Sequence, residues 1–233
     1  MERRRDLLEA DIYDRRFSDR ELAAQRAFWV PICRFLQPYV DASGATLDLG
    51  AGYCHFINNI RSDRKYALDL NAKNLDRYAA AGVEKVVGSG SRIPSLSDAS
   101  IHTVFASNVY EHFPSREDVA ASLAEVWRIL RPGGRFIILQ PNFAYCMKNY
   151  FDFFDHRLAF THRAMIEALD IEGFAVKRAI DRFLPYTSKS RLPSAPWLVS
   201  LYLHVPLAWK ILGGQFLLIA EKQDRAMPRE PTG

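Results

Sequence analysis

The segment Thr46-Leu-Asp-Leu-Gly-Ala-Gly-Tyr-Cys54 decides the fold, together with Tyr66-Ala-Leu-Asp-Leu70 farther along the chain. The run 45–49 is short, apolar and ends at a glycine, which predicts a buried parallel strand followed by a turn and a helix. Gly50 and Gly52 let the backbone turn sharply and lie close to a ligand, because neither carries a Cβ atom. Asp69 ends a second predicted strand. In doubly wound sheets an acidic residue roughly 20 positions after the glycines binds ribose hydroxyls, so these segments predict a nucleoside site.

The glycine pattern also bears on the kind of cofactor. Dinucleotide sites need a third glycine for the pyrophosphate, and the spacing Gly50-x-Gly52-x-x places His55 there instead. The sequence contains no Gly-Lys-Ser or Gly-Lys-Thr phosphate loop. A cofactor without phosphates is therefore favoured. The alternative interpretation of this segment alone is an ordinary connection between a strand and a helix.

Three further segments resemble class I S-adenosylmethionine-dependent methyltransferases. They are Val86-Val-Gly-Ser-Gly-Ser-Arg-Ile-Pro94, Ile101-His-Thr-Val-Phe-Ala-Ser-Asn-Val-Tyr-Glu-His-Phe113 and Val126-Trp-Arg-Ile-Leu-Arg-Pro-Gly-Gly-Arg-Phe-Ile-Ile-Leu139. The resemblance covers about 40–180 and the final strand. It implies an α/β fold with a doubly wound, mostly parallel seven-stranded Rossmann-like sheet that closes with an antiparallel C-terminal hairpin, and it implies S-adenosyl-L-methionine as the cofactor.

The alternation of strand and helix predicts the organisation of the chain. We expect a single methyltransferase domain over 1–222, with 1–40 as an N-terminal helical lid that places Tyr13 or Arg16 near the methionine carboxylate. The segment 183–213 is expected to be a substrate-side insertion, and 223–233 a disordered tail. The strands are predicted at 45–50, 65–70, 84–87, 101–107, 134–140, 174–180 and 214–220, and the helices at 53–61, 72–81, 115–130 and 162–172. The capping pair Ser115 and Asp118 begins the third of these helices, and Pro132-Gly133-Gly134 is expected to stop it.

Composition excludes several classes of protein. The net charge is +4, and the basic residues near the start come without a nucleic-acid-binding motif, so no nucleic-acid partner is predicted. Met1-Glu-Arg-Arg-Arg-Asp contains no apolar signal region, and the apolar stretch 197–209 is too short to span a bilayer, which predicts a cytoplasmic protein. The three cysteines are far apart and odd in number, so neither a disulfide framework nor a zinc site is indicated.

The resemblance assigns the cofactor site residue by residue. Gly50 and Gly52 would admit the methionine moiety, and Asp48 would orient the loop or meet the cofactor's amino group. Asp69 would accept hydrogen bonds from both ribose hydroxyls. The family commonly has an aspartate for the adenine amino group where this chain has Ser89, so adenine would bind Ser89 weakly or the backbone at Gly90. The full expected set is Asp48, Gly50, Ala51, Gly52, Asp69, Leu70, Ser89, Gly90, Ser107 and Asn108.

Ser107 and Asn108 lie where the family places the methyl group between donor and acceptor. A sulfonium is already an electrophile, so alignment of the acceptor dominates catalysis, and a general base matters only where the acceptor loses a proton. The candidate bases are His112, Tyr110 and His156. His112 could instead cap or pack the next helix, and the aromatic residues around His156 could simply anchor their loop. No metal site is predicted, although Asp152, Asp155, His156 and His162 lie close together in the sequence.

These observations predict methyl transfer from S-adenosylmethionine to an oxygen, in preference to a nitrogen, of a small or amphiphilic metabolite. The alternatives are non-methyl chemistry with the same cofactor, such as cyclisation, and a non-catalytic binding protein. Within 183–213, cations and hydroxyls would suit an anion. The apolar part, Trp197 to Trp209, would meet a lipid tail or a membrane surface as a peripheral contact, although its composition favours a buried packing helix or a homodimer contact. The sequence does not identify the acceptor.

Overall fold

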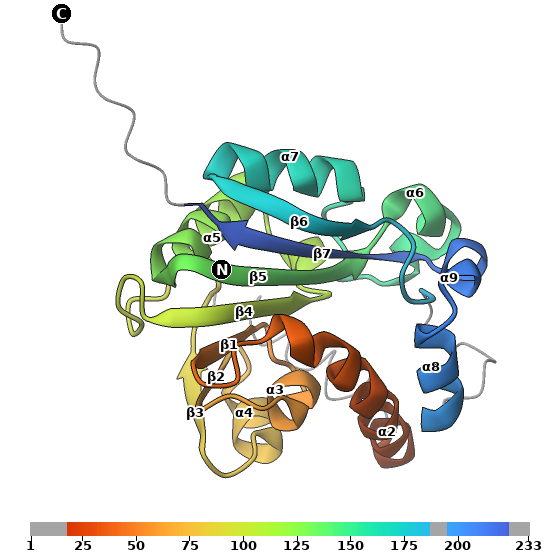
Figure 1. Cartoon of the computed structure of the whole chain (residues 1–233), viewed down its shortest axis with the longest axis horizontal. Helices are drawn as coiled ribbons and strands as arrows, with labels where there is room; N and C mark the ends of the chain where they lie inside the picture. The colour runs from red at the N-terminus through yellow and green to blue at the C-terminus, as the bar shows by residue number, and fades with distance from the viewer. Residues whose placement is uncertain (1–17, 187–194, 224–233) are drawn as a thin grey trace, which may run out of the picture.

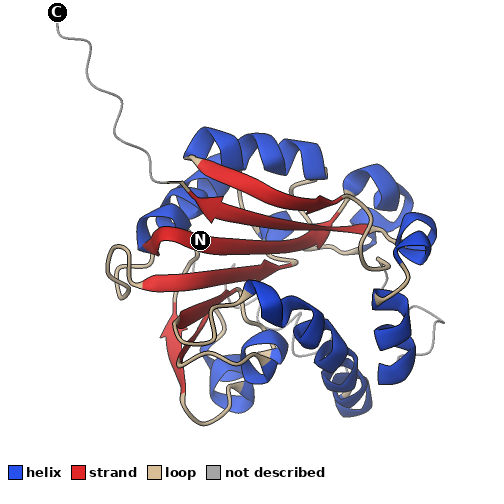
Figure 2. Ribbon diagram, viewed as in Figure 1, coloured by secondary structure: helices blue, strands red, loops and turns tan. Residues whose placement is uncertain are grey.

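The computed structural model describes residues 18–186 and 195–223, which form a seven-stranded sheet between two layers of helices (Figures 1 and 2). The strand order is β3-β2-β1-β4-β5-β7-β6. β1 to β5 run parallel, and β7 lies antiparallel between β5 and β6. The predicted doubly wound sheet with its antiparallel hairpin is thus confirmed. The strands are β1 (Ala45–Leu49), β2 (Arg64–Asp69), β3 (Val83–Val87), β4 (Ile101–Ser107), β5 (Leu130–Pro141), β6 (Phe174–Ile180) and β7 (Gln215–Lys222).

Side chains alternate between the two faces of the sheet, so each central strand supplies two cores. Phe136 and Ile138 of β5 pack with α5 (Arg116–Ile129) and α7 (His162–Glu172) on one face. Ile137 and Leu139 face α2 (Asp19–Leu36), α3 (His55–Asn59), α8 (Pro196–Leu203) and α9 (Pro206–Leu212) on the other. α4 (Ala72–Tyr78) covers the end of the sheet near β2 and β3. Short helical turns complete the chain: η1 (Gln37–Tyr39), η2 (Tyr110–His112), α6 (Phe143–Cys146) and η3 (Met147–Asp152).

Local sequence signals begin the helices. The backbone N–H of Glu21 donates to the Ser18 hydroxyl over 3.4 Å, and the Ser18 N–H donates back to the Glu21 carboxylate over 2.7 Å, so α2 begins with a capping box. Ser115 caps α5 as predicted, since it accepts a hydrogen bond from the Asp118 N–H. The predicted stop differs from the observed one. α5 ends at Ile129, before the Pro-Gly-Gly sequence, because Leu130 already pairs with β4 and residues 131–134 bulge out of the register.

The connection between β6 and β7 contains two helices. α8 and α9 lie between them, and Val199, Leu203 and Trp209 reach the core beneath α2. Residues 187–194, at the start of this segment, lie outside the described residues. So do 1–17, with Tyr13 and Arg16, and the end of the predicted tail, 224–233. Within the described ranges, the helices are too short or too polar to cross a membrane.

Candidate active site

The strand ends gather the predicted cofactor residues at the carboxyl edge of the parallel sheet. The β1 turn is tied to β2 because the N–H groups of Gly50 and Ala51 both donate to the Leu68 carbonyl, over 2.8 and 2.9 Å. Gly50 has a φ of 71°, and a Cβ there would lie 2.4 Å from a methyl group of Val109. Gly52 has a φ of 50°, but a Cβ there would meet nothing within 4 Å. Gly50 therefore serves close packing within the protein, whereas Gly52 borders open space.

Asp69 braces this turn from the neighbouring strand. One of its carboxylate oxygens accepts the Gly52 N–H over 2.7 Å, and the other accepts the Asn71 N–H over 2.8 Å. Burial raises the pKa of Asp69, and these backbone hydrogen bonds oppose the shift. Each carboxylate oxygen can accept more than one hydrogen bond, so ribose hydroxyls can bind without displacing the turn. The next residue, Leu70, is 55% exposed and offers apolar surface beside the carboxylate.

Asp48 lies inside the strand end and is only 3% exposed. It accepts a hydrogen bond from the Ile57 N–H over 3.3 Å and so holds the start of α3 against β1. Burial, reinforced by the nearby Asp69 carboxylate, raises the pKa of Asp48 to about 8. The buried Asp48 and the partly buried Asp69 together form a site that favours a positively charged ligand.

Cys54 adopts the left-handed conformation with a φ of 57°, immediately before α3. This conformation favours glycine, since a Cβ strains the backbone. Its side chain is fully buried, together with Ala67 and Leu75 beneath α4. Burial in this cluster therefore accommodates a cysteine side chain at a position where the backbone favours glycine.

The end of β3 holds the residues expected near adenine. The Gly88 N–H donates to the Asp69 carbonyl over 3.1 Å, which places the turn after β3 beside the Gly50–Gly52 turn that Asp69 braces. The Ser89 hydroxyl lies 2.8 Å from that of Ser91 and accepts the Ser91 N–H, so it is engaged within its own turn. Gly90 is buried, and a Cβ there would press on Leu49 at 3.2 Å. A hollow of about 260 Å³ lies beside this turn, lined by Leu68 and by residues 85–88 and 92–95.

Ser107 and Asn108 follow β4 at the same edge. The Ser107 hydroxyl is buried and has no hydrogen-bond partner among the described residues. Asn108 is in the left-handed conformation, with a φ of 51°, and its N–H donates to the Leu139 carbonyl over 3.0 Å. Asparagine tolerates this conformation better than most residues. A buried hydroxyl of this kind is available to a water molecule or a ligand as a hydrogen-bond partner.

The candidate bases lie in different surroundings. Tyr110 is completely buried in the core under α5, where its hydroxyl lies 3.5 Å from that of Ser122, and burial raises its pKa. His112 is half-buried, and its Nδ1 lies 3.2 Å from the Asp155 carbonyl oxygen and 3.4 Å from the Asp155 carboxylate. A carbonyl oxygen can only accept, so Nδ1 carries the proton and Nε2 carries the lone pair in the neutral ring.

Glu111 was not among the sequence candidates, yet its side chain lies beside that of His112. Its carboxyl group is 1% exposed, accepts a hydrogen bond from Gln140 Nε2 over 2.7 Å, and lies 3.9 Å from His112 Nε2. Gln140 also accepts the Val109 N–H over 2.9 Å. One amide therefore links Glu111 to Val109, which packs on Gly50. Burial raises the pKa of Glu111. The Glu-His pair after β4 was the sequence signal for this residue, whereas nothing near Gln140 in the sequence indicated its role.

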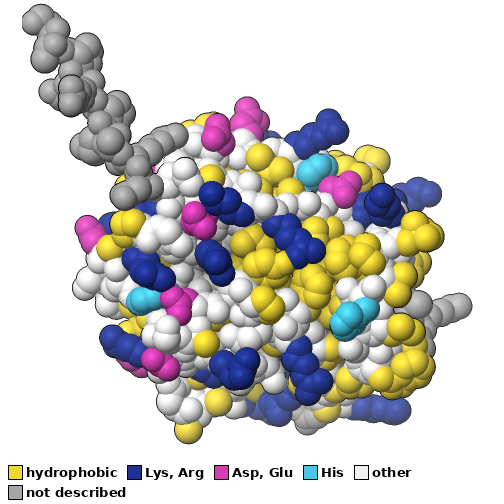
Figure 3. All heavy atoms as spheres, in the orientation of Figure 1, with side chains coloured by type: hydrophobic (Ala, Val, Ile, Leu, Met, Phe, Trp, Pro, Cys, Tyr) yellow, Lys and Arg dark blue, Asp and Glu magenta, His cyan; other side chains and the backbone are white. Residues whose placement is uncertain are grey.

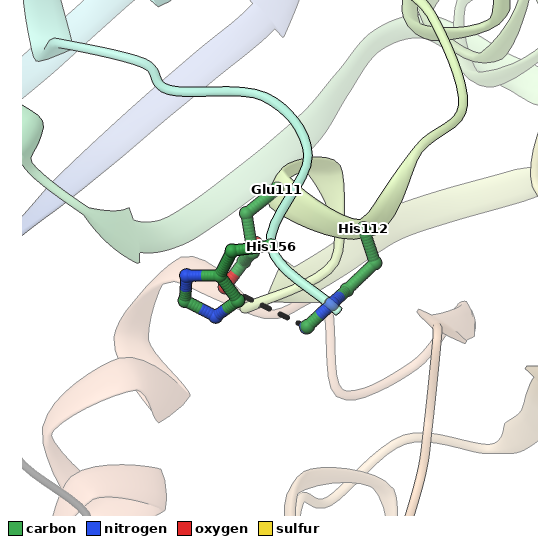
Figure 4. A group of neighbouring side chains, drawn as sticks. All are labelled: Glu111, His112 and His156. Atoms are coloured by element: carbon green, nitrogen blue, oxygen red, sulfur yellow. Dashed lines mark ion pairs between the residues drawn. The ribbon is translucent and has the colours of Figure 1, made fainter. Parts of the chain in front are cut away.

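His156 comes from the loop after η3 and reaches the same place (Figure 4). Its ring lies 5.1 Å from that of His112, measured between centroids, and stacks on Phe153 while Tyr150 meets it edge-on. Glu111, His112 and His156 converge, with ligand atoms all within 4.8 Å of one another. Such a cluster suits either proton transfer or a metal ion. His162 contacts the Asn142 amide instead and lies outside the cluster. The absence of a metal remains a prediction.

Comparison with known proteins gives the class of this fold. A chain from the complex between the Haloferax volcanii Trm112 methyltransferase activator and its methyltransferase has a TM-score of 0.66 at 17% identity, over 92% of this chain and 97% of that one. An S-adenosylmethionine-dependent methyltransferase from Archaeoglobus fulgidus has a TM-score of 0.63 at 18% identity, over 91% of this chain and 97% of that one. At these identities the likeness shows a Rossmann-like methyltransferase fold.

Sequence comparison adds the family. Residues 47–138 match a family described as "Methyltransferase domain". A dimethylglycine N-methyltransferase from Parasynechococcus marenigrum (strain WH8102) is 33% identical over 109 residues, which cover 42% of this chain and only 38% of that relative's length. The match identifies a methyltransferase domain at 47–138, and the fold is the one that S-adenosylmethionine-dependent methyltransferases adopt.

Proposed function

We propose that the chain methylates an oxygen, in preference to a nitrogen, of a small or amphiphilic metabolite, with His112 as the general base. The observation that carries this proposal is the hydrogen bond from His112 Nδ1 to the Asp155 carbonyl. It fixes the tautomer and leaves the lone pair on Nε2. Hydroxyl acceptors need a base of this kind, because they lose a proton on methylation.

The cofactor fits the residues that the structure brings together. Asp69 would hold the ribose, and the open space over Gly52 would admit the methionine moiety. The unsatisfied Ser107 hydroxyl supplies a hydrogen bond near the reacting groups, and the buried Asp48 favours a ligand with positive charge. When bound, S-adenosylmethionine supplies a methyl group on an electrophilic sulfonium.

The residues of the chain then align the acceptor and remove its proton. His112 Nε2 takes the hydroxyl proton as the acceptor oxygen forms its bond to the methyl carbon and the bond from that carbon to sulfur breaks. The products are a methyl ether, S-adenosylhomocysteine and a protonated His112. Asp155 acts through His112 by holding its ring, and the buried Glu111 stabilises the imidazolium.

The dimethylglycine N-methyltransferase relative is named for an acceptor that is a tertiary amine. The neutral form of such an amine has no proton to lose, so a base would add nothing to its methylation at a pH above the pKa of the amine. The two acceptor classes therefore give different results when His112 is replaced. This difference makes the base role testable before the natural acceptor is known.

The test assays His112→Ala against acceptors bearing a hydroxyl and acceptors bearing a weakly basic tertiary amine that is neutral at the assay pH. We expect turnover of hydroxyl acceptors to fall by about 10²- to 10⁴-fold, with turnover of amines little changed. His102→Gln, at the opposite end of β4, is the matched control. Equal activity of wild type and His112→Ala on hydroxyl acceptors would remove His112 as the base. Product analysis separates the alternatives. Methylthioadenosine as a product would indicate cyclisation. A protein that binds the cofactor but forms neither methylthioadenosine nor S-adenosylhomocysteine would be a non-catalytic binding protein.

A further inference from the structure

The outer side of α8 and α9 is apolar and exposed. Their inner side packs in the core through Val199, Leu203 and Trp209. We define the α8–α9 face as the six outer residues that are between 41% and 68% exposed, namely Trp197, Leu201, Val205, Leu207, Ile211 and Leu212. Figure 3 shows apolar side chains collected over the side of the molecule where these helices lie.

Folding of the segment does not need this exposed surface. The two helices are joined to each other and to the sheet by inner contacts: Trp209 Nε1 donates to the Tyr202 carbonyl over 2.8 Å, and the Tyr202 hydroxyl donates to the Phe183 carbonyl over 2.5 Å. Each exposed apolar side chain costs hydration free energy, and a contiguous patch of this kind usually marks a binding surface. The face is therefore suited to a partner that covers it.

The charge of the segment identifies the kind of partner. The chain carries 27 acidic residues, but none lies between Asp181 and Glu221. The same segment holds Arg182, Lys189, Arg191 and Lys210, of which Lys189 and Arg191 lie outside the described residues. A segment that combines exposed apolar side chains with cations and contains no carboxylate matches the surface of an anionic bilayer. In a twofold homodimer, the same face would meet itself and bring like charges together.

We propose that the α8–α9 face rests on an anionic lipid bilayer. The helices have eight and seven residues, so they lie on the membrane and do not span it. Trp197 lies in the first turn of α8 and is 67% exposed, which suits the preference of tryptophan for the interface between lipid and water. Lys210 extends from the last turn of α9, where an ammonium group can reach lipid phosphates.

Side-chain contacts connect the α8–α9 face with the residues around His156. Arg182 joins them, because its guanidinium donates to the carbonyls of Gly213 and Ile211 and lies over the Tyr145 ring of α6. Farther in, Tyr186 lies against Phe153 and Tyr150, the rings that surround His156. Resting on the proposed function, this arrangement lets an amphiphilic acceptor keep its apolar part in the membrane while its hydroxyl reaches His112.

The test is co-sedimentation of the full chain with vesicles of phosphatidylcholine alone or mixed with phosphatidylglycerol. We expect binding to the mixed vesicles that weakens with salt. The double variant Trp197→Ser/Ile211→Ser should lose at least about tenfold in the ratio of bound to free protein. The control is Ile171→Ser on α7, because Ile171 is 74% exposed but lies on the other helical layer. It should bind like the wild type.

Two further measurements separate the outcomes. Affinity for S-adenosylhomocysteine checks that the double variant is folded, and methyl transfer to a soluble acceptor without vesicles tests the proposed function independently of lipid. Failure to bind mixed vesicles, or equal binding by the wild type and the double variant, would overturn the lipid proposal. A wild-type dimer that the double variant splits, without vesicle binding, would overturn it in favour of a second copy of the chain.

Discussion

The two glycines of the cradle should respond differently to the same substitution. In Gly50→Ala, the left-handed backbone costs about 1–2 kcal/mol, and the new Cβ would lie 2.4 Å from a Val109 methyl group. Relief of that overlap in a packed core adds about 1–3 kcal/mol. We therefore expect the free energy of unfolding to fall by about 2–5 kcal/mol. In Gly52→Ala, only the backbone term applies, so the loss should be about 1–2 kcal/mol.

Cofactor binding should be more sensitive to substitution of Gly52 than of Gly50, when both variants are folded under the conditions of the assay. The space that the Gly52→Ala Cβ enters is open in the protein and is where the methionine moiety is expected, so affinity for S-adenosylhomocysteine should fall at least about tenfold. Urea unfolding and calorimetry measure the two quantities. Gly50→Ala combined with Val109→Ala is the control, since removing the methyl groups should restore most of the packing loss. Unchanged cofactor affinity in Gly52→Ala would refute the placement of the cofactor over this glycine.

Three other predictions concern charge and metal ions. Asp69→Ala should lower S-adenosylhomocysteine affinity by at least about tenfold in calorimetry, because two charge-assisted hydrogen bonds to the ribose are lost. An affinity within twofold of that of the wild type would contradict the role of Asp69 in binding the ribose. Burial raises the pKa of Asp48 to about 8, and pairing with the cofactor's ammonium group requires the ionised carboxylate, so S-adenosylmethionine affinity should rise with pH toward about 8. At higher pH the affinity should fall, because the amino group of the cofactor loses its own proton. Asp48→Asn should abolish the rise, and an identical pH profile in the variant would refute the pairing. Because we assign the Glu111, His112 and His156 cluster to proton transfer, EDTA should leave methyl transfer unchanged; a loss that Mg²⁺ or Zn²⁺ restores would establish a metal site there.

The sequence by itself predicted the doubly wound sheet and the methyltransferase domain, and it indicated the candidate cofactor residues. These signals are local: a strand, its glycine turn and the acidic end of the next strand lie within a few dozen residues, and period-two apolar runs specify buried strands wherever they occur. The N-terminal cap of α5 at Ser115 was predictable for the same reason, as were the strands at 101–107 and 174–180. Boundaries that depend on pairing were not, such as the start of β5 at Leu130 instead of the predicted 134, because a strand partner far away in sequence decides them.

Only the tertiary structure decided how the acceptor side is built. Gln140 joins Val109 to Glu111, and Asp155 orients His112, across separations of 29 to 43 residues that carry no local pattern. The segment from Trp197 to Trp209 is apolar on nearly every side, so its sequence does not distinguish an inner face from an outer one. Packing against α2 and the sheet buries Val199 and Leu203 and leaves Trp197 exposed, because the core has room for only one side of each helix.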